Sequence, residues 1–512
     1  MSISGNSTGL RIAVESSLGV LPGTPVWKPY EPRTYPNFGG EITTTPRDFI
    51  SDDRQQKKGV VTDVDANAEF DTDLTQDNLI DLLQGFFMRN WIEKPTTNPR
   101  TGTKVVITAV DEVNDQYEAA SGLDTKGFVA NHLILAENFD DASNNGLKTV
   151  AAVAAGAIDV VEDLTVADGA PATEAMLTVV GYQFDTSTVD VDATPGAFPK
   201  LVRASGTVDF TTIGLQIGDA IWIGGDGSDN DFVNAVNNGL AYVYSIAATE
   251  VVLYKTSGVM VDETGTDLDV QIFFGHRINN AAASADFNRR SFQIERTLGT
   301  IAGVGVQSEY IVGAVPNTME ISIPAADKVT VKLAFVGKDH ETRAASIGVK
   351  AGTRPTLDDR DAFNTSSDFS RFRVAPVSEI NSFPDALFAF ALEMSLSMNN
   401  NVEPLKAIAN LGAVDMNVGV LQVGGTAEVY FETVDAIAAV RANQSITLDW
   451  MIAKNNAGWA LDIPLMTLGN GQANIESNQP VRLPLNTQAA KDSRLGYTIS
   501  MTEFKYLPTV AE

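Results

Sequence analysis

Three histidines, His132, His276 and His340, are the residues of this 512-residue chain best suited to acid–base catalysis or metal binding. They lie far apart in the sequence, and none has a second histidine or a carboxylate at the spacing of a metal site. The chain has no His-Glu-x-x-His zinc motif and no phosphate-binding loop motif. It has no cysteine, which excludes thiol nucleophiles, thiolate metal sites and disulfides. We therefore expect ordinary surface or turn histidines.

Clustered carboxylates suggest calcium binding as a second kind of chemistry. Residues 225–231 have the oxygen-rich composition that calcium prefers. A calcium loop of the EF-hand type, however, needs a glutamate at its twelfth position, and counting from Asp226 that position is Asn237. We expect a solvated loop between strands.

Two pairs of aspartates have a spacing that could serve an acid and a base: Asp63 with Asp65, and Asp71 with Asp73. Both members of each pair share one face of a strand, because side chains alternate. An acidic stripe that faces solvent or a lumen explains this spacing without catalysis. We predict no catalytic residue, no metal site and no cofactor, and a protein that is not an enzyme.

One charged stretch, residues 46–58, is better suited to contacts with another subunit. It mixes both signs of charge densely between two predicted strands. It could be an exposed loop that only aids solubility. Alternatively, it is an arm whose charges meet complementary ones on a neighbouring subunit and set the register of that contact. The candidate assembly residues are Arg47, Asp52, Asp53, Arg54, Lys57 and Lys58.

The elements that carry these residues are mostly strands. Alternating patterns predict strands over residues 60–64, 66–74, 318–323, 329–336, 426–432 and 445–452. Helices are predicted at residues 75–87, with Thr75 as the N-cap, and at residues 434–441. In the first helix, Leu79, Leu82, Leu83 and Phe86 form one apolar stripe. The predicted fold class is mainly β.

Two internal repeats predict the architecture. The order strand, long loop, strand, helix occurs twice, about 360 residues apart in the sequence, with loops at residues 46–58 and 399–411. A smaller repeat lies inside the first copy, where Asn144-Asn145-Gly146-Leu147 recurs as Asn237-Asn238-Gly239-Leu240. Asn-Gly steps favour tight turns between strands. We expect two tandem β-sandwich modules, each with a flanking helix, and an inserted pair of small β-barrel-like domains.

The predicted division of the chain follows from these repeats. Module 1 comprises residues 1–100 and, after an insertion, its closing strands at residues 286–345. The insertion, residues 101–285, consists of two units at about 101–182 and 183–285. A linker at residues 346–385 leads to module 2 at residues 386–512.

Charge also separates the insertion from the rest of the chain. The formal net charge of the whole chain is −29. Residues 101–285 contain 26 acidic and 7 basic side chains, whereas the other 327 residues contain 39 acidic and 29 basic ones. A surface this acidic repels nucleic acid, because phosphate binding requires Lys and Arg. We expect the insertion to be a water-facing decoration and the modules to pack against copies of themselves.

The N-terminus has neither the basic region nor the apolar region of a secretory signal. No run of 18 or more apolar residues occurs, so we expect no membrane insertion. The predicted place of synthesis and assembly is the cytoplasm.

Residues 42–59 and the segment 74–87 that follows the next strand resemble the tail tube proteins of long-tailed bacteriophages. Residues 291–296, 313–319 and 331–337 are similar to a second characteristic stretch of that family. The resemblance covers roughly residues 1–100 and 286–512, and the insertion is a departure from it.

This resemblance implies stacked rings that form a hollow tube for delivery of the genome into the host. Two modules per chain then suggest a homotrimeric ring with pseudo-sixfold symmetry, with a homohexamer as the alternative. The implied partners are other tail proteins and viral DNA, which passes through the lumen without specific binding. The implied location is the virion tail, after assembly in the host cytoplasm.

Two other functions remain open at this point. A surface decoration protein with a carbohydrate-binding insert would expose aromatic side chains in loops, and Trp222, Tyr242, Tyr244 and Tyr254 are the candidates. A β-rich hydrolase would need paired carboxylates that converge in a cleft.

Overall fold

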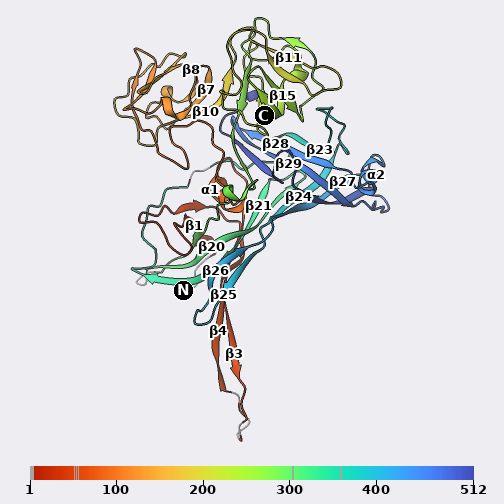
Figure 1. Ribbon diagram of the computed structural model, residues 1–512. Coiled ribbons are helices and arrows are strands. Elements are labelled where there is room, and N and C mark those ends of the chain that lie inside the picture. The colour runs from red at the N-terminus through yellow and green to blue at the C-terminus, as the bar shows by residue number, and fades with distance from the viewer. Residues whose placement is uncertain are drawn as a thin grey trace.

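The computed structural model describes residues 5–50, 52, 55, 57–301, 305–357 and 360–511. These residues form a mainly β protein with two large antiparallel sheets and two short α-helices, which confirms the predicted fold class. Figure 1 shows an elongated molecule, with residues 101–285 at one end and a long hairpin at the other. We refer to residues 101–285 as the acidic segment.

The larger sheet contains two groups of elements from separate parts of the chain. The first strand set consists of β1 (Gly9–Val14), β2 (Lys28–Tyr30), β3 (Thr34–Arg47), β4 (Lys57–Asp73), β19 (Phe292–Ile301), β20 (Gly305–Pro324), β21 (Thr330–Gly337) and β22 (Asp339–Ala345), with helix α1 (Ile80–Phe86). Strand β18 (His276–Asn279), from the acidic segment, lies in the larger sheet beside the second set. The second strand set consists of β23 (Phe369–Pro376), β24 (Ala391–Asn399), β27 (Gln422–Tyr430), β28 (Ile446–Lys454), β29 (Ala457–Asn470), β30 (Arg482–Ala489) and β31 (Ser500–Phe504), with helix α2 (Asp435–Arg441). A separate hairpin joins β25 (Val402–Lys406) to β26 (Ala413–Val418).

The two strand sets have the same strand order. In the first set, neighbouring strands follow the order β3, β4, β21, β20, β19, β1, and in the second the order β24, β27, β30, β29, β28, β23. A helix follows the second strand of each order, α1 after β4 and α2 after β27. The sets are joined by pairing of β20 with β24.

The core of the first set forms where α1 packs on the sheet. Leu79, Leu82, Leu83 and Phe86 are fully buried, as the predicted stripe requires. Phe335 of β21 contacts the rings of Phe70, Phe86 and Phe292 at centroid distances of 6.1, 5.4 and 6.2 Å. The helix is shorter than predicted, because it begins at Ile80 and the N-cap position is Leu79 instead of Thr75.

The acidic segment forms its own sheet from thirteen strands of the described chain. Its strands are β5 (Ile107–Asp111), β6 (Gln116–Ala119), β7 (His132–Glu137), β8 (Gly146–Val153), β9 (Ala157–Val160), β10 (Met176–Gln183), β11 (Val189–Asp192), β12 (Lys200–Arg203), β13 (Ala220–Ile223), β14 (Gly239–Ala247), β15 (Glu250–Tyr254), β16 (Glu263–Thr264) and β17 (Gln271–Phe274).

Both halves of this smaller sheet also share one strand order. The order β5, β6, β9, β8, β7, β10 is matched by β11, β12, β15, β14, β13, β17, and the halves meet where β10 pairs with β17. The two Asn-Asn-Gly turns occupy matching places: Asn145 and Asn238 each bridge the backbone of the residue six positions earlier, Phe139 and Phe232.

The acidic segment is anchored to the second strand set. Leu133, Tyr242 and Phe273 share an apolar core with Met451 of β28 and Phe504 of β31. Strand β18, within the range expected for the insertion, pairs with β31 in the larger sheet. Strand β23, within the range expected for the linker, pairs with β28. The insertion is therefore packed against the sheet over a continuous apolar contact.

Candidate assembly surfaces

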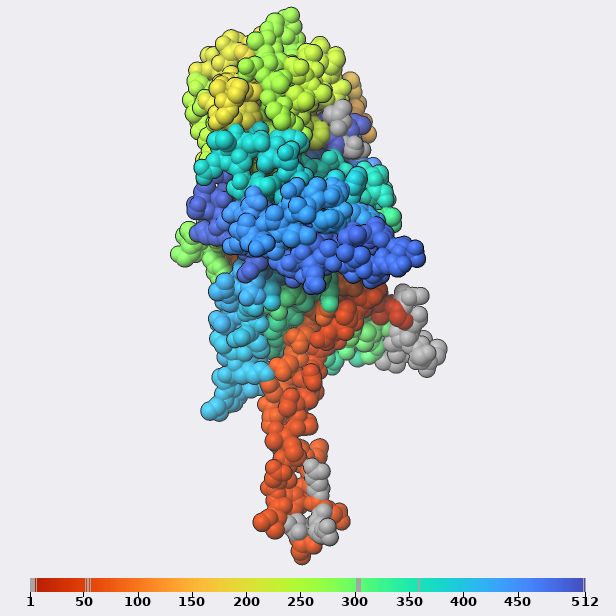
Figure 2. Space-filling view, turned by 90° about the vertical axis from the view of Figure 1, so that its right-hand side faces the viewer, coloured from red at the N-terminus to blue at the C-terminus, as the bar shows by residue number. Residues whose placement is uncertain are grey.

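Strands β3 and β4 form an arm that projects from the body of the molecule (Figures 1 and 2). Their pairing continues to Arg47 opposite Lys57, so the predicted loop at residues 46–58 begins and ends as strand. Val64 is the last buried side chain of β4 toward the tip, and Ile42, Val60 and Val61 are 60%, 55% and 52% exposed. An exposed hairpin with apolar side chains is a typical contact site for another chain.

The described assembly residues lie at the end of this arm. Arg47, Asp52, Lys57 and Lys58 are all exposed, whereas Asp53 and Arg54 lie outside the described residues. The ammonium of Lys57 lies 4.6 Å from the ring centroid of Phe49. Arg47 and Lys57 are directly opposite each other, and such like-charged pairs are unfavourable within a hairpin. An acidic partner from outside the hairpin would offset this repulsion.

The β25–β26 hairpin forms a second, shorter arm beside the first. The predicted loop at residues 399–411 therefore contains a strand, β25, followed by the turn of this hairpin. Lys406 forms ion pairs with Asp63 and with Asp65, the latter at 2.6 Å. Ile408 and Leu411, in the turn of this hairpin, are 100% and 58% exposed. Both arms thus present apolar side chains to solvent.

The outward face of the larger sheet is acidic. Alternation along β4, β20, β24 and β27 places one row of side chains in the core and the next row on the opposite face. The acidic side chains on this face are Glu41, Asp63, Asp65, Glu69, Asp71, Asp73, Glu320, Glu393 and Glu428. Lys332 and Arg482 share the face and pair with Glu69 and Glu428.

The aspartate pairs predicted as a stripe belong to this face. Asp71 accepts a hydrogen bond of 2.8 Å from Thr34, and Asp73 pairs with Lys328 at 2.5 Å. With Asp63 and Asp65 held by Lys406, each of these carboxylates has a neutral or cationic partner on the protein surface.

The family model described as "Phage tail tube protein" matches residues 5–489. The chain belongs to this family. The match includes the acidic segment, which the sequence resemblance did not cover. Family membership supports a structural role in the tail tube, as a component of the virion tail that assembles with other copies and other tail proteins. No curated protein matches the chain.

The histidines of this tail tube protein have structural surroundings. His132 and His276 are buried, so the expectation of surface histidines is wrong for both. His132 accepts a hydrogen bond from the Val129 amide, its Nε2 contacts the Ile213 carbonyl at 3.2 Å, and burial lowers its pKa to about 4. His276 accepts a hydrogen bond of 3.0 Å from the Lys94 amide, and burial lowers its pKa well below the usual value. Both rings therefore act as neutral hydrogen-bonding groups.

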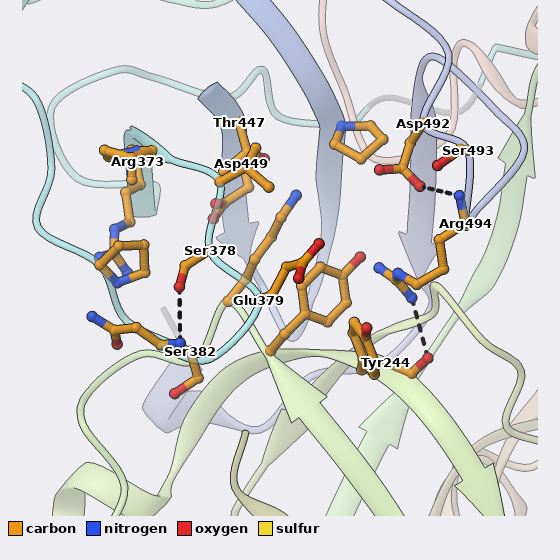
Figure 3. Close-up of a pocket in the computed structure, with 18 of the residues that line it drawn as sticks. Tyr244, Arg373, Ser378, Glu379, Ser382, Thr447, Asp449, Asp492, Ser493 and Arg494 are labelled. Carbon is orange, nitrogen blue, oxygen red and sulfur yellow. Dashed lines mark hydrogen bonds between the residues drawn. The ribbon is translucent and has the colours of Figure 1, made fainter. Parts of the chain in front are cut away.

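A cavity of about 230 Å³ lies between the acidic segment and the second strand set (Figure 3). Two of its charged lining residues, Arg371 and Asp449, pair with each other, and a third, Lys255, pairs with Asp462. Arg494 covers the rings of Tyr244 and Tyr254 at 4.1 and 4.7 Å and donates to the Tyr244 carbonyl. These contacts fasten the two parts of the molecule together.

The aromatic residues considered for carbohydrate binding lie in strands. Trp222 is in β13, Tyr242 and Tyr244 are in β14, and Tyr254 is in β15. Tyr242 and Tyr254 are 1% and 7% exposed and belong to the core shared with the second strand set. Packing within the protein therefore accounts for these aromatic side chains without a role in sugar binding.

The calcium-like loop at residues 225–231 is held by a hydrogen bond between its own first and last residues. Asp231 accepts a hydrogen bond of 2.7 Å from the Gly225 amide, and burial raises its pKa. The described residues contain no group of three or more His, Cys, Asp or Glu side chains arranged to hold a metal ion. No helix of the described chain is long and apolar enough to cross a membrane.

Residues 5–9 (Gly-Asn-Ser-Thr-Gly) have the Gly-x-Ser-x-Gly spacing of a hydrolase nucleophile, which our sequence reasoning missed. That motif requires a sharp turn from a strand into a helix. Here Ser7 ends a single 3₁₀ turn (Gly5–Ser7), and strand β1 follows it. The structural setting of a nucleophile is therefore lacking at this serine.

Proposed function

We propose that this tail tube protein assembles with copies of itself into rings, and that the rings stack into the conduit through which the phage genome enters the host. The observation that carries the proposal is the occurrence of one strand order twice within one continuous sheet. Each chain then supplies two successive positions of a ring. Sheets with open edges are hazards in a monomer, but they serve as joints in an assembly.

The proposed division of the chain follows the two strand sets. Module 1 is residues 1–100 with 286–345, and module 2 is residues 386–512. The acidic segment, as two units at 101–182 and 183–285, is a solvent-facing addition to this ring. Residues 346–385 connect the modules and supply β23 to the second. Three chains would give a ring with pseudo-sixfold symmetry, and six chains forming a homohexamer is the alternative.

The acidic face of the larger sheet is suited to line the lumen. Carboxylates on β3, β4, β20, β24 and β27 outnumber the cationic side chains that pair with them, which include Lys328, Lys332, Lys406 and Arg482. Lys and Arg bind DNA by displacing the counterions condensed on its phosphates, so a wall of carboxylates offers DNA no binding site. Viral DNA would pass through without specific binding.

The β3–β4 arm is suited to join one ring to the next, with Arg47, Asp52, Asp53, Arg54, Lys57 and Lys58 at the contact. The opposed Arg47 and Lys57 favour an acidic partner on another subunit, and the exposed apolar side chains favour burial against it. Assembly in the host cytoplasm and final location in the virion tail follow from this role.

Electron microscopy of the purified full-length protein tests the proposal, together with sedimentation over a range of concentrations. We expect rings of three chains with six similar lobes, and stacks of these rings at high concentration. A protein that stays monomeric at every concentration would overturn the proposal. Rings of six chains would favour the hexamer.

A further inference from the structure

The junction between the two strand sets provides a template for the contact between chains. Within one chain, β20 pairs with β24 from Thr318 opposite Asn399 to Pro324 opposite Glu393. On the core side of this junction Ile321 lies opposite Leu396, and Met319 lies opposite Met398. All four side chains are at most 2% exposed.

This junction joins strands that are not counterparts of each other. By strand order, the counterpart of β20 in the second set is β29, and the counterpart of β24 in the first set is β3. One chain therefore holds both halves of a second junction of the same kind, at opposite margins of its sheet. Within the described part of the chain, β3 pairs with β4 and with no other strand.

Strand register identifies the residues of the second junction. In the first set, Lys332 of β21 lies between Asp71 of β4 and Glu320 of β20. In the second set, Arg482 of β30 lies between Tyr430 of β27 and Asn474, with which it forms a bridge. Because Ala68 and Ala427 are equivalent by sequence and pairing, Lys332 corresponds to Arg482, and Glu320 corresponds to Asn474.

The same reasoning assigns the partner of Asn474. Glu320 lies opposite Ser397 of β24. Phe38 lies opposite Ala68, and Met394 lies opposite Ala427, so Phe38 and Met394 are counterparts. Ser397 is three residues after Met394. Its counterpart in β3 is therefore Glu41, three residues after Phe38. Asn474 is thus matched with Glu41.

The two margins expose the side chains that the template buries. Ile475, the counterpart of Ile321, is 76% exposed, and Ile42, the counterpart of Met398, is 60% exposed. Of residues 472–478, Asn474 alone has a described bridge, whereas the corresponding residues 318–324 form continuous strand. An unpaired, partly apolar edge of this kind is a template for strand addition.

We infer that residues 472–477 add as an antiparallel strand to β3 of a second copy of this chain, with Asn474 opposite Glu41, Ile475 opposite Gly40 and Ala473 opposite Ile42. This inference rests on the proposed ring, and it specifies the strands and the register that close it. A shift of two residues in one direction would place Glu41 opposite Glu476, and like charges directly opposite are unfavourable. The charges therefore favour the inferred register over that alternative.

An engineered disulfide tests the register, since the natural chain has no cysteine to interfere. Glu41→Cys with Asn474→Cys places the two thiols on opposed residues, whose Cα atoms in an antiparallel pair are about 5 Å apart, within the range of a disulfide. The matched control is Asn37→Cys with Asn474→Cys, because Asn37 lies on the same face of β3 four residues away, roughly 13 Å along the strand. Six strands separate the two margins within one chain, roughly 30 Å, so a disulfide must join two chains.

After mild oxidation, we expect the Glu41→Cys/Asn474→Cys protein to form covalent oligomers in denaturing gels about tenfold more than the control, reversibly on reduction. Rings that form without this cross-link, or that cross-link equally in the control, would overturn the inferred register and leave the proposed function standing. Absence of rings from the natural protein and both variants would overturn both.

Discussion

The two internal duplications of this protein join their halves in different ways. In the acidic segment, β10 pairs with β17, which is its counterpart in the other half. In the larger sheet, β20 pairs with β24, which is the counterpart of β3. The first junction pairs the same edge of both halves, so neither half keeps that edge free to pair with another chain. The second joins unlike edges, so each chain keeps one unused edge of each kind.

The acidic segment is therefore closed by its own pairing, whereas the larger sheet can continue its pairing into further chains. Like-to-like contacts end in a pair, whereas unlike contacts continue until a ring closes or a filament grows. The charge distribution agrees, because the closed unit carries most of the net negative charge and the propagating sheet is closer to balance. Strong like charge opposes self-association and is tolerable where no copy needs to bind.

The largest expected effect comes from a charge at the unused edge. Ile475→Asp should abolish ring formation, because an inserted carboxylate would be buried without a partner at the junction. The folded chain itself should be unaffected, since Ile475 is 76% exposed. Val233→Asp, at a position 82% exposed in the acidic segment, is the matched control and should assemble normally. Sedimentation of both variants measures the result, and normal rings from Ile475→Asp would contradict the role of this edge.

A substitution at the junction of β10 with β17 should disrupt the acidic segment without affecting the rings. A Cβ at Gly181 would lie 2.3 Å from the carbonyl oxygen of Ile272 in β17, so Gly181→Ala forces β10 and β17 apart. We expect a loss of about 3 kcal/mol in the stability of the acidic segment, with ring formation retained. Gly169→Ala, which meets nothing within 4 Å, is the control. Amide hydrogen exchange measures the local stability, and unchanged protection in Gly181→Ala would refute the expected separation.

Acid should loosen the same junction through His132, whose ring in β7 contacts Ile213 in the other half. Burial lowers its pKa from 6.5 to about 4, so the folded protein binds this proton more weakly than the unfolded chain does. The contribution of His132 is complete above pH 6.5 and is lost as the pH falls toward 4, by about 2 kcal/mol at pH 5.

Replacement of this histidine separates its effect from that of other groups. His132→Gln keeps a side-chain amide that can donate to Ile213 but removes the titration. Hydrogen exchange of the acidic segment at pH 7 and pH 5 should therefore change less in His132→Gln than in the natural protein. An identical pH dependence in the two proteins would show that His132 does not control the loss of stability.

Local patterns in the sequence predicted part of this architecture. The stripe of Leu79, Leu82, Leu83 and Phe86 has helical period and becomes the buried face of α1. The Asn-Gly turns at Gly146 and Gly239 lie at the starts of β8 and β14. Such signals depend on residues close in the sequence, so they survive without knowledge of the fold.

The pairings between distant segments were not predictable in this way. Strand β25 was taken for part of a loop, because a mostly exposed strand lacks the apolar alternation that identifies half-buried ones. The burial of His132 and His276 depends on Ile213 and Lys94, which are remote in the chain. The arm residues were proposed from charge alone, and the opposition of Arg47 and Lys57 required the register of β3 and β4.

The smallest expected effect concerns the tip of the β3–β4 arm. Lys57→Glu with Lys58→Glu should weaken the stacking of rings and leave the rings themselves intact, because both lysines lie at the tip of the arm, away from residues 40–42 of β3 that pair at the inferred ring junction. Exposed ion pairs contribute about 0–1 kcal/mol each, and salt screens them, so the defect should be greatest at low ionic strength. Arg441→Glu with Lys491→Glu, also at exposed positions, changes the net charge equally and should stack normally.

Tube length in electron micrographs at low and high salt distinguishes the two surfaces. If the Lys57/Lys58 variant forms rings but short tubes, the arm joins rings and the sheet margins close them. If the variant instead loses rings, the arm takes part in ring closure, and the separation between the two surfaces is wrong. If both reversed proteins stack poorly, net charge rather than the arm governs stacking, because the two variants differ only in where the charge was reversed.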